Sequence, residues 1–250
     1  MRRVGVAAAI TIGTLVSACG DTSDSGATLR VFAAASLSDL MTDLATAFET
    51  SDVATDGVDV VVNAAGSSTL RLQLDEGANG DVFTPANTEQ LLLLDAGTVG
   101  EPVVFATNRL VSAHRADEPP IGIERYGDSG LVLGACAPSV PCGAFAAVAF
   151  DAAGVEPSLD TQEPDVRSLA SKVAEGELDA GLVYVTDVLA DTRLAAVELP
   201  SSVDVQELDV VYPIVQLADA ASPELAGAFV EFLGTDTARS IIAAHGFGLP

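Results

Sequence analysis

Positive charge is scarce in this sequence. Lys and Arg together number 11, and Lys172 is the only lysine, whereas Asp and Glu number 36 and the net charge is −25 over 250 residues. A protein that binds nucleic acid needs a basic surface to neutralise phosphates, and these basic residues are too few even for a local patch. The composition therefore excludes a nucleic-acid-binding protein.

Patterns typical of enzymes and metal sites are also lacking. The chain has two widely separated histidines, His114 and His245, and three cysteines, none of them at metal-ligand spacing. It has no Gly-x-Ser-x-Gly elbow, no P-loop and no dinucleotide-binding fingerprint. Each histidine is interpreted as structural or solvated. A hydrolase is the enzyme alternative, but the sequence predicts no catalytic residues, no bound metal cation and no cofactor.

No hydrophobic run is long enough to span a bilayer, which needs about 20 residues. The longest candidate, Val4 to Val16, follows the basic start Met1–Arg3 and ends in Val16-Ser17-Ala18-Cys19. Small residues before a cysteine resemble a lipobox. We predict a signal peptide at 1–18, lipid on Cys19, a tether at 19–27 and anchoring to the outer face of the cell membrane. The alternative is an ordinary signal peptide with a chance cysteine.

Two cysteines remain after Cys19 is used for lipid. Exported proteins can hold disulfides, and Cys136 and Cys142 form an even pair separated by Pro138 and Pro141. We expect a local disulfide between them, and two free buried thiols are the alternative.

The rest of the chain alternates short apolar runs with helical patterns. This alternation predicts strands that run parallel, with helices as crossovers, and no Gly/Ser-rich linker divides the first set of elements from the second. The expected fold is α/β and two-lobed, each lobe a mostly parallel sheet flanked by helices. The expected strands are Leu29–Ala34, Val58–Val62, Asp81–Thr84, Leu110–Ala113, Leu131–Gly134, Ala180–Val185 and Val210–Leu217, and the expected helices include Ser38–Phe48, Ser68–Glu76, Thr88–Asp95, Gly143–Ala152 and Asp165–Glu175.

Four of these helices begin with small or polar residues directly after a strand or loop. Helix N-termini carry unpaired N–H groups and a partial positive charge, so several that converge form an anion site. In open α/β sheets such a crevice lies at the carboxyl ends of the strands. Each segment taken singly is more commonly a helix cap. The four are residues 33–38, 66–69, 141–143 and 164–167.

The order of these motifs resembles the molybdate-binding component of ABC importers, a branch of the type II periplasmic binding proteins. The resemblance covers residues 29–250, and its most specific part is Phe-Ala-Ala-Ala-Ser-Leu at 32–37 with Ser-Ser-Thr-Leu at 67–70. The other matching segments are 81–87, 140–143, 165–167, 181–184, Tyr212-Pro213 and Gly246-Phe247.

The resemblance implies a tetrahedral oxyanion held by neutral donors. Ser36 and Ser67 would give hydroxyl and backbone N–H groups, Cys142 and Val166 backbone N–H groups, and Tyr184 its phenol hydroxyl. The family pattern has Ala at the Cys142 position, which a backbone contact tolerates, and it differs at Thr84-Pro85, where no ligand contact is expected. The implied protein is a monomer that delivers molybdate, and tungstate, to an ABC permease and its ATPase.

The lobes are expected at 28–106 plus 214–250 and at 107–213, with a hinge at 106–109 and 211–214. A site made only of donors would disfavour hydrogen phosphate, whose proton meets no acceptor. Sulfate would have to be excluded by size. Two alternatives stay open: a binder of sulfate or a small carboxylate on the same fold, which an Arg clamp would favour, and a surface adhesion lipoprotein. Arg167 is expected to be solvated or paired with a carboxylate, and Asp165 to be a helix N-cap.

Overall fold

The computed structural model describes residues 27–203 and 208–250. The predicted signal peptide, Cys19 and all but the last residue of the tether lie outside these residues. Among the described residues, no helix has the length and apolar character needed to cross a membrane.

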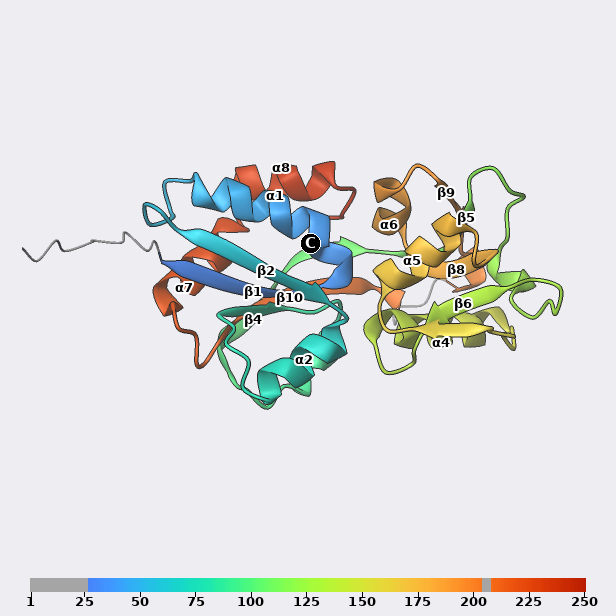
Figure 1. The fold of residues 1–250 in the computed structure, drawn as a ribbon, viewed down its shortest axis with the longest axis horizontal. Helices are drawn as coiled ribbons and strands as arrows, with labels where there is room; N and C mark the ends of the chain where they lie inside the picture. The colour runs from blue at the N-terminus through green and yellow to red at the C-terminus, as the bar shows by residue number, and fades with distance from the viewer. Residues whose placement is uncertain (1–26, 204–207) are drawn as a thin grey trace, which may run out of the picture.

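Two five-stranded sheets, each flanked by helices, form two lobes side by side (Figure 1). The first lobe contains β1 (Thr28–Ala34), η1 (Ala35–Leu37), α1 (Ser38–Glu49), β2 (Asp59–Ala65), α2 (Ser67–Asp75), β3 (Val82–Thr84), α3 (Glu89–Leu92), β4 (Thr98–Asn108), β10 (Val210–Leu217), α7 (Pro223–Phe232) and α8 (Asp236–Ala244). The second contains β5 (Leu110–Arg115), η2 (Ile123–Arg125), β6 (Leu133–Cys136), α4 (Pro141–Ala153), β7 (Thr161–Glu163), α5 (Val166–Glu175), β8 (Ala180–Tyr184), α6 (Val185–Ala190), β9 (Leu194–Glu198) and η3 (Ser201–Val203).

The two sheets have matching strand orders, β2-β1-β3-β10-β4 and β7-β6-β8-β5-β9. In the first sheet β10 is antiparallel to both of its neighbours, and in the second β5 is antiparallel to both of its neighbours. The other pairings are parallel, so four strands of each sheet run in one direction. This confirms the expected α/β fold with mostly parallel sheets.

The two lobes are joined where β4 leads into β5 and where β9 leads back to β10. β4 and β10 pair antiparallel, with Asn108 opposite Val210 and Ala106 opposite Tyr212. Because the two crossing segments lie next to each other, they bring together residues that are distant in sequence at the junction of the lobes.

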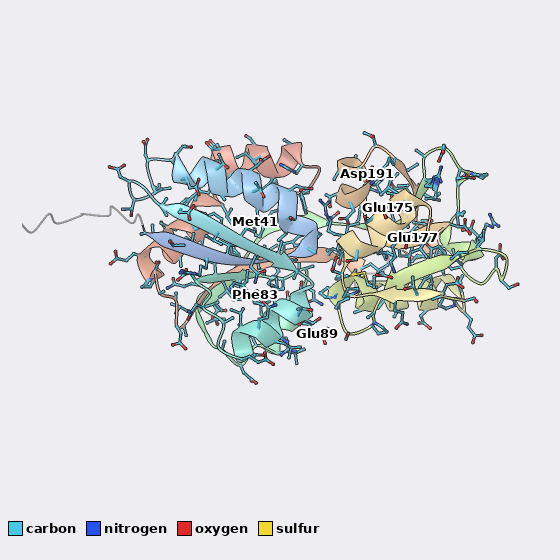
Figure 2. The ribbon with its side chains drawn as sticks, viewed as in Figure 1. Met41, Phe83, Glu89, Glu175, Glu177 and Asp191 are labelled. Carbon is cyan, nitrogen blue, oxygen red and sulfur yellow. A yellow bond between two sulfur atoms is a disulfide. The ribbon has the colours of Figure 1, made fainter. Side chains whose placement is uncertain are left out.

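Both faces of β1 are largely buried, which explains its apolar run. Leu29, Val31 and Ala33 lie in the core cluster that also contains residues of α1, α7 and α8, whereas Phe32 points to the smaller cluster that contains residues of α2. Phe83 is also buried, while acidic Glu89 lies on the surface (Figure 2). The apolar side chains thus fix the sheet between two helical layers.

Several local predictions were wrong in extent. Helix α3 is shorter than the expected Thr88–Asp95, because the side of this segment that carries Leu92 has no core to pack on, and Leu92 is 82% exposed. Strands β4, β7 and β9 and helix α6 were not predicted. His114 is buried, since β5 lies inside the sheet between β8 and β9, which agrees with the structural alternative rather than the solvated one.

Candidate functional site

A small cavity lies where the two lobes meet. Its volume for the centre of a water-sized sphere is ≈ 20 Å³, somewhat more than the roughly 10–15 Å³ that one water needs. It therefore has room for a ligand of only a few atoms. The residues around it come from both lobes: Ala34, Ala35, Ser36, Gly66, Ser67, Ala86, Val140, Pro141, Cys142, Asp165, Val166 and Tyr184.

All five residues implied by the resemblance line this one cavity. Ser36 follows β1 in the turn η1, and Ser67 is the first residue of α2 after β2. Both are buried, with 8% and 2% of their surface exposed. The Ser36 hydroxyl lies 2.9 Å from the Tyr212 hydroxyl, and the Ser67 hydroxyl accepts a hydrogen bond of 3.1 Å from the backbone N–H of Ala86. The first lobe thus supplies two fixed hydroxyls.

The second lobe supplies two helix N-termini. Cys142 lies in the first turn of α4 and Val166 is the first residue of α5, so their backbone N–H groups have no acceptor within the helix. Asp165 caps α5 and accepts from the Ser168 N–H at 2.9 Å and the Ser168 hydroxyl at 3.0 Å. The predicted N-cap role of Asp165 is therefore confirmed, and its carboxylate is engaged within its own helix turn.

A disulfide joins Cys136 at the end of β6 to Cys142, with their Cα atoms 5.7 Å apart. The start of α4 also lies very close to the preceding loop. A Cβ on Gly143 would sit 1.9 Å from the Ala137 carbonyl oxygen, so only glycine fits there. The disulfide and this close contact together fix the position of the Cys142 N–H.

Tyr184 is the most unusual donor of the set. It is 1% exposed, and its hydroxyl has no hydrogen-bond partner among the described residues. Burial raises the pKa of Tyr184 well above its usual value, and the nearby Tyr212 and Asp187 raise it further. The phenol is therefore neutral and keeps its proton available for a ligand that accepts it.

Asp187 contacts the backbone of Tyr184, and the sequence did not indicate it as a residue near the site. It accepts the Tyr184 backbone N–H at 3.1 Å and is 2% exposed. Burial raises the pKa of Asp187 to about 7, although Arg167 and the Tyr184 N–H act to lower it. Asp187 therefore supports the start of α6 rather than facing the cavity, which it does not line.

The cavity has no cation among its described lining residues. Arg167, the neighbour of Val166, pairs instead with the carboxylate of Asp39 at 2.5 Å. This agrees with the expected role as a carboxylate partner. Within residues 27–203 and 208–250, no cluster of three or more His, Cys, Asp or Glu side chains is placed to hold a metal ion.

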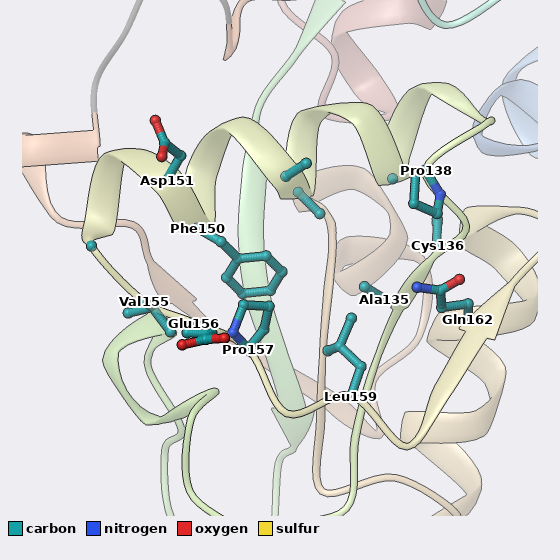
Figure 3. Close-up of a pocket in the computed structure, with 14 residues that line it drawn as sticks. Ala135, Cys136, Pro138, Phe150, Asp151, Val155, Glu156, Pro157, Leu159 and Gln162 are labelled. Atoms are coloured by element: carbon teal, nitrogen blue, oxygen red, sulfur yellow. The ribbon is translucent and has the colours of Figure 1, made fainter.

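A much wider cavity of ≈ 560 Å³ lies within the second lobe, along α4 (Figure 3). Phe150, Pro157 and Leu159 give it apolar walls, and its charged residues are Asp151 and Glu156. Carboxylates repel an anion, and the walls come from one lobe only. The smaller cavity between the lobes is therefore the better candidate for an anion site, despite its size.

Comparisons with known proteins agree with this geometry. Residues 29–248 match the family described as bacterial extracellular solute-binding protein. The molybdate-binding protein ModA of Mycobacterium tuberculosis is 35% identical over 268 aligned positions that cover 100% of both chains. ModA of Escherichia coli is 28% identical, and the alignment covers 88% of each chain.

Two solved structures show the same fold. The periplasmic molybdate-binding protein of Azotobacter vinelandii superposes with a TM-score of 0.75 at 21% identity, covering 89% of this chain and 99% of its own. The sulfate-binding protein SubI of Mycobacterium tuberculosis also reaches 0.75, at 16% identity, covering 90% and 87%. The fold alone thus does not distinguish the two anions. The full-length match to the family shows that this chain belongs to the bacterial extracellular solute-binding proteins.

Proposed function

We propose that this chain binds molybdate, and tungstate, between its two lobes. The observation that carries this proposal is the Tyr184 hydroxyl, which is buried with no hydrogen-bond partner among the described residues, beside a cavity that also receives Ser36, Ser67 and two helix N-termini. Burying a dianion costs much hydration energy, so it needs many hydrogen bonds in return. Donors from O–H and N–H groups to a charged acceptor are the stronger kind.

The choice of molybdate rests on the donor set and on the relatives. Among the described residues that line the cavity, only the engaged Asp165 has a carboxylate, and none is a cation that could form a clamp of the kind that an organic acid would favour. The relative with 35% identity over its whole length is named as a molybdate-binding protein. Sulfate has the same charge but is smaller, so the size of the cavity has to discriminate against it, through donors spaced too widely to reach all of its oxygens.

The proposal includes delivery to a membrane permease driven by a separate ATPase. Lipid on Cys19, after removal of residues 1–18, would hold the protein at the outer face of the membrane as a monomer on its tether of residues 19–27. Lobes at 28–106 plus 214–250 and at 107–213 would close on the ligand through the crossing segments. Ligand contacts to both lobes favour the closed form, since they exist only there. The protein binds its ligand without transforming it.

Isothermal titration of the full-length protein in mild detergent tests the proposal. Molybdate, tungstate, sulfate, phosphate and a small carboxylate are titrated in turn. We expect saturable binding of molybdate and tungstate with similar affinity and no response to sulfate at millimolar concentrations. Binding of sulfate or a carboxylate alone would keep the fold and replace the ligand. No binding of any of the five anions would refute the oxyanion site and favour an adhesion role.

A further inference from the structure

The hydroxyl of Ser36 belongs to a chain of hydrogen bonds that starts at the junction of the lobes. Asn108, the last residue of β4, donates from Nδ2 to the Tyr212 hydroxyl at 3.2 Å, and that hydroxyl lies 2.9 Å from Ser36 Oγ. The same Nδ2 donates to the Thr186 hydroxyl of the second lobe at 2.8 Å. Tyr212 itself is fully buried.

The direction of this chain follows from the groups at its start. The backbone N–H of Arg109 can only donate, and it donates to Asn108 Oδ1 at 2.9 Å. This contact identifies the amide oxygen, so the other end of the Asn108 amide is the NH₂ donor that faces Tyr212. Tyr212 therefore accepts from Asn108, and among the described residues Ser36 is the one other group that hydrogen-bonds to its hydroxyl, so the Tyr212 proton is directed to Ser36. Ser36 then accepts from Tyr212, and its proton points away from both.

Ser67 is held in the same sense by a different group. Its hydroxyl oxygen accepts the Ala86 N–H, which leaves the Ser67 proton free. Tyr184 has no partner in the described structure and also keeps its proton. All three hydroxyls around the cavity are thus arranged to donate. Two of them, those of Ser36 and Ser67, are fixed as donors because their oxygens already accept from another group.

We propose that Asn108 and Tyr212 are positioning residues that fix the Ser36 hydroxyl as a donor and thereby exclude protonated oxyanions such as hydrogen phosphate. The inference rests on the proposed function and adds to it a cause for the choice of molybdate over hydrogen phosphate, which has the same charge. Hydrogen phosphate brings one proton that needs an acceptor. At Ser36 the phosphate proton would compete with the Tyr212 proton for the Ser36 oxygen, and the Ser36 proton would lose its own acceptor.

Two variants change the direction of the chain. Asn108→Asp replaces the NH₂ donor with a carboxylate oxygen, so Tyr212 must donate to it, Ser36 must donate to Tyr212, and Ser36 then offers a lone pair to the cavity. Tyr212→Phe removes the donor behind Ser36. The control is Tyr126→Phe, because Tyr126 is another fully buried tyrosine with its hydroxyl 3.1 Å from a serine hydroxyl, that of Ser112, and it does not line the cavity.

The readout is the ratio of the Kd for phosphate to the Kd for molybdate, measured by titration of the full-length protein in alkaline buffer where phosphate is a dianion. The added negative charge of Asn108→Asp weakens the binding of both anions alike, so its effect cancels in this ratio. We expect the ratio to fall about tenfold or more in Asn108→Asp and several-fold in Tyr212→Phe. The ratio should be unchanged in Tyr126→Phe, although the thermal stability of this variant should also fall.

An unchanged ratio in both variants, with a loss of stability like that of Tyr126→Phe, would make Tyr212 a structural residue and overturn the inference while the proposed function stands. Should Asn108→Asp fail to fold, Tyr212→Phe alone decides. A wild-type protein that binds no molybdate would refute the proposed function, and the inference would fall with it.

Discussion

The guanidinium of Arg167, on α5 of the second lobe, lies 2.5 Å from the carboxylate of Asp39, on α1 of the first lobe. The same guanidinium lies 3.8 Å from the buried carboxylate of Asp187. The contact joins the lobes beside the candidate site, so it can exist only when they are together. Because both partners are partly exposed, at 36% and 53%, the ion pair is screened by solvent and contributes little energy.

Asp39→Asn should therefore weaken molybdate binding only slightly, because it removes an ion pair that stabilises the closed arrangement. We expect Kd to rise roughly 1.5- to 5-fold, the equivalent of about 0.2–1 kcal/mol, and the difference to shrink as salt is added. Titration at low and high ionic strength measures both effects. Asp191→Asn is the matched control, since the partner Arg193 lies in the same lobe. An equal effect of the two substitutions would show that Arg167 and Asp39 do not assist closure.

Gly66 is a second point of contact between the lobes. A Cβ at this position would lie 2.5 Å from the Pro164 carbonyl oxygen across the site, whereas the backbone φ of −55° suits any residue. Gly66→Ala should leave the folding of each lobe intact and prevent full closure. We expect the Kd for molybdate to rise roughly 5- to 150-fold, from a steric cost on the order of 1–3 kcal/mol.

The control for Gly66→Ala is Gly130→Ala, where a Cβ meets nothing within 4 Å. Titration gives the affinity, and thermal melting without ligand gives the stability. Similar melting temperatures and an affinity loss in Gly66→Ala alone are expected. Full affinity in Gly66→Ala would mean that the ligand is held without this approach of the lobes.

Tyr184→Phe removes only the hydroxyl, which has no hydrogen-bond partner in the described part of the chain, and keeps the ring that packs edge-on near Phe145. A lost hydrogen bond to a charged ligand should cost about 1–3 kcal/mol, which raises Kd roughly 5- to 150-fold. Stability without ligand should not fall, because the substitution removes no hydrogen bond between described residues. Tyr126→Phe should show the reverse, a lower melting temperature with unchanged affinity. An unchanged Kd in Tyr184→Phe would remove this residue from the site.

These residues differ in how far the sequence could reveal them. The helix starts at Ser67, Cys142 and Val166 follow from local patterns, a strand or loop followed by small or polar residues and then an amphipathic run. Asp165 could be recognised as a cap for the same reason. Local chemistry decides such features, so these helix starts and most strands were predicted within a few residues, whereas the choice of donors came from the resemblance to a known family.

Features that depend on distant contacts were missed. β4 is mostly exposed and carries no clear apolar pattern, and it forms because β10, about 100 residues later, pairs with it. The bond between Ser36 and Tyr212 joins residues 176 positions apart. The buried Asp187 likewise looks in sequence like an ordinary residue of a short helix. Only the folded chain shows which polar groups meet at the junction of the lobes.

Net charge predicts the kinetics of binding. The chain has a net charge of −25, and no cation is found among the described residues that line the cavity. The protein therefore repels an approaching dianion. Added salt screens this repulsion, and the association rate constant for molybdate should rise with ionic strength. Stopped-flow measurement of tyrosine fluorescence at several salt concentrations checks this. A rate that falls with salt would indicate a local positive potential at the entrance and would contradict a site built only of neutral donors.

Asp187 predicts a dependence of stability on pH. Its pKa is about 7 in the folded protein, against a model-compound value of 3.8, chiefly because of burial, so the folded state holds the proton more tightly than the unfolded state. The contribution to stability is thus fully present below about pH 4 and is lost as pH rises to about 7, with a slope of about 1.4 kcal/mol per pH unit from this one group. Asp187→Asn keeps an oxygen for the Tyr184 N–H and does not titrate. Chemical denaturation of both proteins across this range should therefore give free energies of unfolding whose difference, wild type minus variant, falls with pH. Parallel profiles would show that Asp187 is ionised throughout and that Arg167, 3.8 Å away, compensates its charge.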